Sequence, residues 1–336
     1  MWRFEEAVRA AWKESLDVVT QGGEVIARQL REDLHSITAR AGCDDLTQIL
    51  SHREMFPSIP LIYWTADAVG FGDEEVLQDL AVGAFLAYFY IRFQDDVLDD
   101  HAGSPGGLLV GNVCLEGFYS RYRKHFPSHH PFWRIWADLL ARYTQTTLWE
   151  LRRRGKKRRV FTTADLERLG DKFLPATAPP AAVALLADRP ELIASLEEIV
   201  GSLGRGLQLV NDHTGLMHDF KTHNYTAVIC DILLGVPPLR EMEELSFPQR
   251  TLTTDAMERN LRRSKVFFKC ASTEAHRSGV SYVTAYSAEH EAYIEGEIRR
   301  LQAMRREVRQ LDEMETENSM ECLHQKALPQ ALQGGG

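Results

Sequence analysis

A run of acidic residues follows an apolar stretch in the first third of the chain. Residues 80–91 are almost entirely apolar, and Asp95, Asp96, Asp99 and Asp100 come shortly after them. On a helix the first three of these aspartates lie on one side, because residues three or four apart stack over one another. Like charges on one helical face repel, so a stable fold needs a neutralising partner. A divalent cation is the obvious partner, and the run predicts a cavity above these aspartates.

A second polar stripe ends another predicted helix. Asn211, Gly215 and Asp219 are spaced four apart, which places them within about 80° of one helical face. Taken alone they form an ordinary polar stripe, but amide and carboxylate oxygens are also hard ligands for a cation. Two such helix ends that face each other would hold several magnesium ions. Such a site suits a ligand rich in negative oxygens, above all a diphosphate.

Basic and apolar residues near the two stripes fit this ligand. The cations that could bind a diphosphate are Arg168, Lys172 and Lys221, with Arg299 and Arg300 as weaker candidates that are more typical of a surface. The side chains expected at the cavity wall are Tyr88, Phe89, Tyr90 and Leu207. About half of the aromatic run should belong to the core instead. A diphosphate at the mouth and an apolar pocket behind it describe a prenyl diphosphate site.

Helical periodicity dominates the chain, and alternating strand patterns are nearly absent. Helices are expected over residues 1–42 with a break at Gly22 and Gly23, 44–55, 60–69, 73–102, 108–124, 131–154, from 163 onward, 190–221, 224–234, 254–277 and 281–311. No linker, repeat or shift in composition interrupts them. Residues 1–312 are therefore expected to form one all-α domain of about ten or more helices around a central cavity. Residues 313–336 are expected to form a mobile tail.

Composition excludes several classes of function. The 336 residues are 44% hydrophobic and 26% charged, as in an ordinary soluble globular protein. The net charge of −9 disfavours nucleic-acid binding. Five scattered cysteines without a CxxC pattern argue against a zinc site or a disulfide framework, and indicate a reducing compartment. The longest apolar run is shorter than the roughly 20 residues that span a bilayer. We expect a cytoplasmic protein without a membrane span.

These motifs resemble those of the isoprenoid synthase superfamily, which includes polyprenyl diphosphate synthases and class I terpene synthases. Residues 93–100 resemble the first aspartate-rich motif, DDxxD, and residues 206–212 resemble the approach to the second motif of the prenyl synthases. Lys172 is similar to their diphosphate-contacting lysine, and residues 111–115 resemble a segment that follows their first motif. The resemblance covers roughly residues 60–225. It implies the isoprenoid synthase fold and a prenyl diphosphate substrate.

The resemblance also implies a set of roles. Three Mg²⁺ ions would be bound at Asp95, Asp96, Asp99, Asn211, Gly215 and Asp219. Asp95, Asp96, Asn211 and Asp219 would be the catalytic residues, and Arg168, Lys172 and Lys221 would contact the diphosphate. Aromatic faces such as Phe89 and Tyr90 would stabilise an allylic cation. Homodimers are common among such proteins, although no pattern in this sequence points to one.

Departures from the prenyl synthase motifs distinguish cyclisation from chain elongation. Gly215 replaces the third aspartate of the second prenyl synthase motif, and the pattern N-D-x-x-G-x-x-x-D is similar to the terpene synthase triad, with Asp219 in place of its glutamate. Residues 103–107 stand where elongating synthases carry paired arginines. We therefore expect a class I terpene synthase, a lyase that ionises farnesyl or geranylgeranyl diphosphate and cyclises the cation. The alternatives are a prenyl transferase that elongates with isopentenyl diphosphate, and a non-catalytic subunit of one.

Overall fold

The computed structural model describes residues 4–41, 56–98, 105–153, 160–234 and 247–327, and all regular structure within these ranges is helical. The α-helices are α1 (Glu5–Thr20), α2 (Glu24–Ala41), α4 (Pro60–Val69), α5 (Glu74–Leu98), α6 (Pro105–Arg123), α7 (Pro131–Leu151), α8 (Thr163–Leu169), α9 (Ala178–Leu186), α10 (Ile193–Thr214), α11 (Leu216–Lys221), α12 (Ala227–Leu234), α13 (Phe247–Thr253), α14 (Ala256–Ser278) and α15 (Ser281–Ala327). Two 3₁₀ segments, η1 (Gly170–Thr177) and η2 (Pro190–Leu192), complete the described helices. The prediction of an all-α fold is confirmed.

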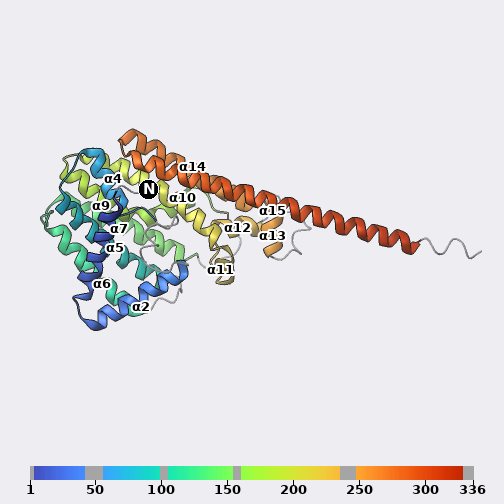
Figure 1. Ribbon diagram of the computed structural model, residues 1–336, viewed down its shortest axis with the longest axis horizontal. Coiled ribbons are helices and arrows are strands. Elements are labelled where there is room, and N and C mark those ends of the chain that lie inside the picture. The colour runs from blue at the N-terminus through green and yellow to red at the C-terminus, as the bar shows by residue number, and fades with distance from the viewer. Residues whose placement is uncertain (1–3, 42–55, 99–104, 154–159, 235–246, 328–336) are drawn as a thin grey trace, which may run out of the picture.

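Helix α5 is a central core helix of the molecule (Figure 1). Its first turn is acidic, as the helix dipole favours, and Asp73 Oδ1 accepts a hydrogen bond from the Val76 amide at 3.1 Å. By length and composition α5 could cross a membrane, but 67% of its apolar window is buried inside the protein. Packing against α1 and α6 therefore explains its apolar character.

A buried carboxylate ties α5 to α6. The side chain of Asp79 is only 8% exposed, and it accepts hydrogen bonds from Arg121 at 2.6 Å and from Lys124 at 2.9 Å. His125 Nε2 lies 3.1 Å from the other oxygen. This cluster holds the start of α5 against the end of α6, at the opposite end of α5 from the predicted acidic site.

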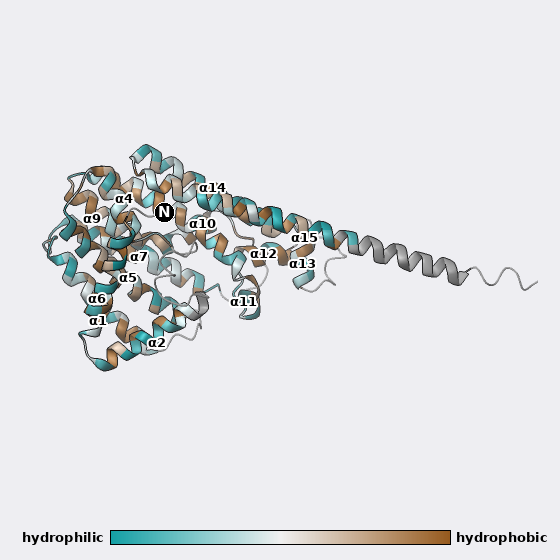
Figure 2. Cartoon of the chain, viewed as in Figure 1, coloured by the Kyte–Doolittle hydropathy of each residue, from teal (hydrophilic) through white to brown (hydrophobic). Residues whose placement is uncertain are grey.

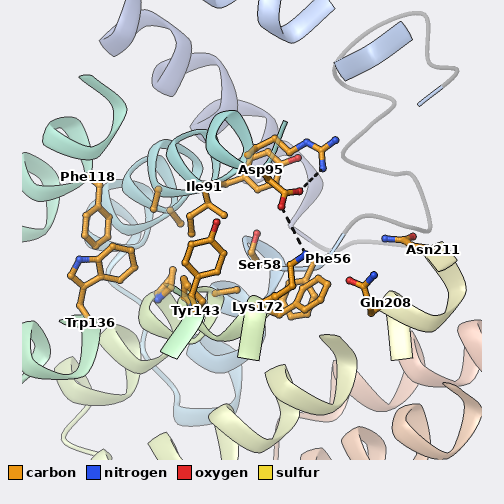
Figure 3. A pocket seen from close by; sticks show the side chains of 18 residues that line it. Phe56, Ser58, Ile91, Asp95, Phe118, Trp136, Tyr143, Lys172, Gln208 and Asn211 are labelled. Carbon is orange, nitrogen blue, oxygen red and sulfur yellow. Dashed lines mark ion pairs between the residues drawn. The ribbon is translucent and has the colours of Figure 1, made fainter. Parts of the chain in front are cut away.

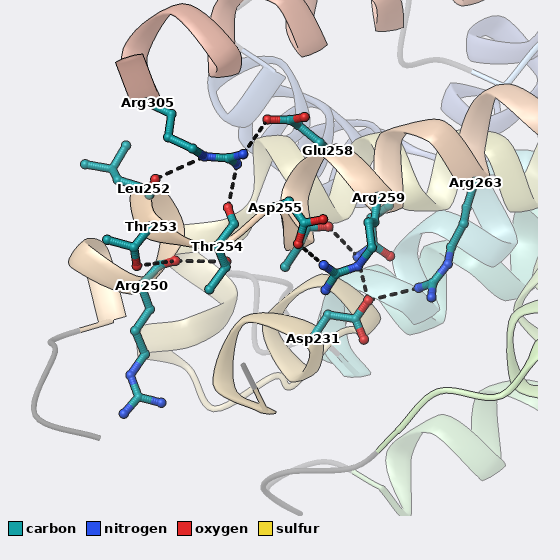
Figure 4. A network of polar contacts seen from close by, with 12 residues as sticks. Asp231, Arg250, Leu252, Thr253, Thr254, Asp255, Glu258, Arg259, Arg263 and Arg305 are labelled. Atoms are coloured by element: carbon teal, nitrogen blue, oxygen red, sulfur yellow. Dashed lines mark hydrogen bonds and ion pairs between the residues drawn. The ribbon is translucent and has the colours of Figure 1, made fainter. Parts of the chain in front are cut away.

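The C-terminal helices form the other side of the molecule. Helix α10 packs on α14, and α14 packs on α15, which projects beyond the other helices in Figure 1. Figure 2 shows hydrophilic residues interspersed with hydrophobic ones along α2, α14 and α15, as expected of helices with one solvent face. Figure 4 shows how Arg305 on α15 joins its neighbours. Its guanidinium donates to the carbonyls of Leu252 at 3.3 Å and Thr254 at 2.5 Å, and pairs with Glu258 at 2.9 Å.

Several helix boundaries differ from the predictions. The break near Gly22 is confirmed, because α1 ends at Thr20 and α2 begins at Glu24. The helix predicted to run to Lys221 ends at Thr214, where Gly215 interrupts it before the short α11. Helix α15 continues to Ala327, past residue 311, where the sequence placed its end. The helix predicted over residues 44–55 lies outside the described residues.

Helix α13 was not predicted, because its seven residues are too few to show a period. It forms where Phe247 can stack on Phe220 of α11, with ring centroids 3.7 Å apart. The N-cap of α8 is Thr162, whose hydroxyl accepts a hydrogen bond from the Asp165 amide in a reciprocal capping box.

Candidate active site

A cavity of about 250 Å³ lies among α5, α6, α7, η1, α9 and α10. Figure 3 shows Phe118 and Trp136 at one end of it, and Asp95, Gln208 and Asn211 toward the other. Apolar and aromatic side chains form most of the wall. The cavity therefore has an aromatic end and a polar end, the arrangement that the sequence predicted for a prenyl diphosphate site.

One stripe of α5 forms a wall of this cavity. Ala84, Tyr88, Ile91 and Asp95 line it, and they follow the spacing of three or four residues that defines one helical face. The adjacent stripe belongs to the core, where Phe89 stacks on Phe93 with 6.0 Å between ring centroids. Asp95 thus ends the cavity stripe one turn beyond Ile91.

Asp96 lies on the core side of α5. The residue is only 4% exposed, and its carboxylate pairs with Arg92 at 3.1 Å. The same guanidinium lies 3.6 Å from the carboxylate of Asp95. The sequence predicted that Asp95 and Asp96 share one face of the helix, but in the structure they lie on different faces. The guanidinium of Arg92, on the same helix, balances part of their charge. Asp99 and Asp100 lie outside the described residues.

Lys172 brings a second positive charge to the polar end of the cavity. Its Nζ lies 3.9 Å from Asp95 and donates to Glu150 on α7 at 2.7 Å. Burial would lower the pKa of Lys172, but the carboxylates of Glu150 and Asp95 outweigh burial and raise it above the ordinary value. The lysine is therefore charged at neutral pH, and it faces the cavity beside Asp95.

The second motif reaches the cavity through Asn211. Its Oδ1 is buried and has no hydrogen-bond partner among the described residues. Gly215 lies between α10 and α11, and a Cβ at this position would come within 3.3 Å of the Asp219 carboxylate. Gly215 has no side chain that could bind a metal, and the absence of a Cβ leaves space for the Asp219 carboxylate. The other oxygen of Asp219 accepts from Asn224 at 3.1 Å.

Asp212 is the most deeply buried carboxyl of this motif, with 2% of its surface exposed. Burial raises its pKa to about 8, and the charges of Asp219 and Glu150 act in the same direction. Gln208 donates a hydrogen bond to it at 2.8 Å. Burial of Asp212 therefore favours its protonated form.

The donor atoms fit a hard divalent cation such as Mg²⁺. Asp95 and Asn211 come from different helices to the polar end of one cavity, and the buried amide oxygen of Asn211 lacks a partner that an ion would supply. Within the described residues, no group of three or more acidic, histidine or cysteine side chains is gathered for a metal. Mg²⁺ also commonly takes ligands from a bound phosphate group.

Several solved structures with a similar arrangement of helices are prenyl diphosphate synthases. A geranylgeranyl pyrophosphate synthase from Lactobacillus brevis superposes with a TM-score of 0.66 at 13% identity, over 86% of this chain and 96% of that one. A decaprenyl diphosphate synthase from Rhodobacter capsulatus gives 0.61 at 12% identity, over 86% and 98%. A polyprenyl synthase from Caulobacter crescentus, solved with calcium and isoprenyl diphosphate, gives 0.55 at 15% identity, over 81% and 97%. No family model and no curated protein matches the sequence.

The chain has the isoprenoid synthase fold. At sequence identities of 12–15%, the similarity to these chains shows the fold alone. The predicted fold class is therefore confirmed, and the reaction must be argued from the site.

Within the isoprenoid synthase fold, the predicted cavity wall needs correction. Of the four residues expected there, only Tyr88 lines the cavity. Phe89 packs edge-on against Trp12, Tyr90 lies against Gly111 of α6, and Leu207 is buried in the core. The physical reason is the helical period, because a stripe that contains residues 84, 88, 91 and 95 turns residues 89 and 90 away.

Two of the three predicted diphosphate-binding cations also lie elsewhere. Lys172 lines the cavity, but Arg168 lies over the ring of Trp149, 5.1 Å from its centroid. Lys221 is exposed at the end of α11 and is not among the lining residues. Arg300 pairs with Glu297 on the surface of α15 at 2.8 Å.

Sequence reasoning missed several residues of the site. Arg92 stands three positions before Asp95, so its helical spacing could have revealed it. Glu150, Tyr143 and Trp136 come from α7, where no motif marks them. Phe173 lines the cavity because Gly204 leaves room for its ring, and a Cβ on Gly204 would approach that ring to 2.5 Å.

Proposed function

We propose that this chain binds the diphosphate group of an allylic isoprenoid at the polar end of its cavity and breaks the allylic carbon–oxygen bond. The observation that carries the proposal is the meeting of Asp95, Lys172 and Asn211 at one end of a cavity whose wall is mostly apolar and aromatic. The isoprenoid chain would lie along Tyr88 and Ile91 of α5. Its far end would point toward Phe118 and Trp136.

Each group at the polar end has a role in this proposal. Asp95 and Asn211 would hold Mg²⁺, with Asp219, which does not line the cavity, and Asp99 as further ligands expected from the sequence, and the bound ions would supply positive charge to the leaving diphosphate. Lys172 would donate to a diphosphate oxygen and leave its bond to Glu150. The bond pair leaves with the diphosphate, and the apolar wall keeps water from the allylic cation. A set of three ions and a homodimer both stay predictions.

Chain elongation is the better supported fate of that cation. The structural neighbours are named geranylgeranyl pyrophosphate synthase, decaprenyl diphosphate synthase and polyprenyl synthase, and all are enzymes that build prenyl chains. This favours the alternative that the sequence left second, in which the double bond of isopentenyl diphosphate attacks the cation and a proton is lost. Transfer therefore takes precedence over the cyclisation that the sequence favoured.

Cyclisation is kept as the second candidate because of one observation in the second motif. Gly215 makes room for the Asp219 carboxylate, so the motif works with an amide, a glycine and a carboxylate rather than with three aspartates. In this reading an internal double bond attacks the cation and no second substrate is needed.

The deciding experiment uses the purified full chain with Mg²⁺ and geranyl, farnesyl or geranylgeranyl diphosphate, each with and without isopentenyl diphosphate. Longer prenyl diphosphates in the paired reactions would support transfer. A hydrocarbon or an alcohol from one allylic substrate alone would support cyclisation instead. Absence of turnover in every reaction would contradict both, and would favour the non-catalytic subunit.

A further inference from the structure

Arg92 is the basic residue of the site that no motif assigns. It lines the cavity on the same stripe of α5 as Tyr88 and Asp95. Its guanidinium reaches forward along the helix to both carboxylates, at 3.6 Å from Asp95 and 3.1 Å from Asp96. Figure 3 shows Asp95 on the polar side of the cavity, away from Phe118 and Trp136.

The ion pairs of Arg92 with Asp95 and Asp96 reduce the repulsion at the end of α5. The C-terminal end of a helix carries partial negative charge, so two carboxylates at the end of α5 repel the helix as well as each other. The Arg92 guanidinium lies within ion-pair distance of both carboxylates and offsets this repulsion. Arg92 therefore occupies the position that the sequence assigned to a cation from solution.

The contact is also incomplete. The Nε of Arg92 is buried and has no hydrogen-bond partner among the described residues. The distance of 3.6 Å to Asp95 is an ion pair rather than a close hydrogen bond. Lys172, the other basic side chain lining the cavity, is held by Glu150 at 2.7 Å. The contact between Arg92 and Asp95 is thus easier to break than the contact between Lys172 and Glu150.

We propose that Arg92 exchanges partners when the site is loaded: a divalent ion displaces it from Asp95, and the freed guanidinium binds the diphosphate. The idea rests on the proposed function, because it needs a diphosphate at this end of the cavity. A guanidinium offers a planar fork of N–H donors that matches two phosphate oxygens, so the released side chain gains a partner of the same charge as the one it leaves.

The exchange predicts opposite effects on two binding constants. Without Arg92, a metal no longer competes with a guanidinium for Asp95, so the ion should bind the empty protein more tightly. The diphosphate loses a charged donor, so it should bind the metal-loaded protein more weakly. Diphosphate binding should weaken roughly tenfold, since a charged hydrogen bond contributes about 1.5 kcal/mol or more. The gain in metal binding should be smaller, because the 3.6 Å contact with Asp95 is an ion pair and not a close hydrogen bond.

The test measures Mn²⁺ binding by electron paramagnetic resonance, and inorganic pyrophosphate binding by calorimetry at saturating Mn²⁺, on the full chain. The variants are Arg92→Leu and Arg92→Lys, with Arg142→Leu as the matched control. Arg142 is a half-buried arginine of α7 that pairs with Glu197 at 2.8 Å and does not line the cavity. Arg92→Leu should show both changes, Arg92→Lys should show them in reduced size, and the control should show neither.

Each outcome has a distinct meaning. If Arg92→Leu binds both probes as the wild type does, Arg92 is only a structural ion pair and the proposal is wrong. Weaker pyrophosphate binding with unchanged Mn²⁺ binding would also overturn it, because no competition with the metal would exist. If the wild type itself binds no pyrophosphate with Mn²⁺, the proposed function fails first. Arg92→Lys gives the same comparison should the leucine variant not fold.

Discussion

Asp95 and Asp96 are neighbours in the sequence but have different surroundings. Asp95 ends the stripe of α5 that lines the cavity, within 3.9 Å of Lys172. Asp96 faces the core, and its surface is 4% exposed. One residue of helix turns a side chain by about 100°, which is enough to place Asp95 at the cavity and Asp96 on the buried side of α5.

This difference gives a prediction for two single substitutions. Asp95→Asn should lower turnover by roughly a hundredfold or more, because the site loses a charge that holds its cations, while the melting temperature changes little. Asp96→Asn should keep more activity but lower the free energy of unfolding by about 1–3 kcal/mol, since it weakens a buried pair with Arg92. Steady-state kinetics and thermal unfolding of both variants test this. Equal loss of activity in both would show that Asp96 also acts at the site.

Gly204 controls one side of the cavity through a neighbour. A Cβ at this position would lie 2.5 Å from the ring of Phe173, which lines the cavity. Gly204→Ala should therefore destabilise the protein by about 1–3 kcal/mol and weaken substrate binding, because the displaced ring enters the space for the ligand. Gly296→Ala is the control: nothing lies within 4 Å of its Cβ, so added helix propensity should make it slightly more stable. The same loss in both variants would contradict the steric explanation.

At this scale the sequence predicted part of the polar end of the cavity and little of its apolar wall. Asp95, Lys172 and Asn211 were found through their spacing and resemblance, and all three line the cavity. Phe89 and Tyr90 were placed there wrongly because an apolar run on a helix buried on several sides shows no period that separates cavity from core. Arg92 was missed because the motif was taken to begin after it.

Helices α5 and α6 are joined by the Asp79 cluster. Burial alone would raise the pKa of Asp79, but the hydrogen bonds from Lys124, Arg121 and His125 hold it below the ordinary 3.8. A lowered pKa in the folded state means that the carboxylate contributes stability above pH 3.8, and that this stability is lost as the pH falls through the folded pKa. The cluster is therefore an acid-sensitive link between the two helices.

The pH dependence of unfolding tests this link. Asp79→Asn should lower the free energy of unfolding by about 2 kcal/mol at pH 7, and the difference from wild type should shrink below about pH 4. Asp138→Asn, which removes a carboxylate with an exposed side chain on α7, should behave like wild type at both pH values. Denaturant unfolding followed by circular dichroism gives these values. A difference that stays constant down to pH 3 would contradict the assigned role of the charge.

Helix ends were harder to predict than helix positions. The long helices α5, α7 and α14 were expected within a few residues of their bounds, because their patterns extend over many turns. The end of α10 was missed because Asn211 and Asp219 keep a helical spacing across the break at Gly215. Helix α13 depends on the stacking of Phe247 on Phe220, a contact that no local pattern contains.

The aromatic end of the cavity should limit the length of the isoprenoid. Trp136 and Phe118 close this end, with ring centroids 4.5 Å apart. Trp136→Leu should let the site accept or make a product longer by one isoprene unit, at a cost of about 3 kcal/mol in stability. Trp133→Leu on the same helix is the control, because Trp133 does not line the cavity. Chromatography of the products tests this, and an unchanged length distribution would place the limit elsewhere.

The whole molecule brings helices from both halves of the chain to one polar cavity end, where we propose that a prenyl diphosphate is ionised. The most direct measurement is the release of inorganic diphosphate from geranyl, farnesyl and geranylgeranyl diphosphates, with Mg²⁺ or with a chelator. We expect wild-type protein to release it with at least one substrate, only with Mg²⁺, and Asp95→Asn to release almost none. Release by Asp95→Asn at the wild-type rate, or none from the wild type, would contradict the account.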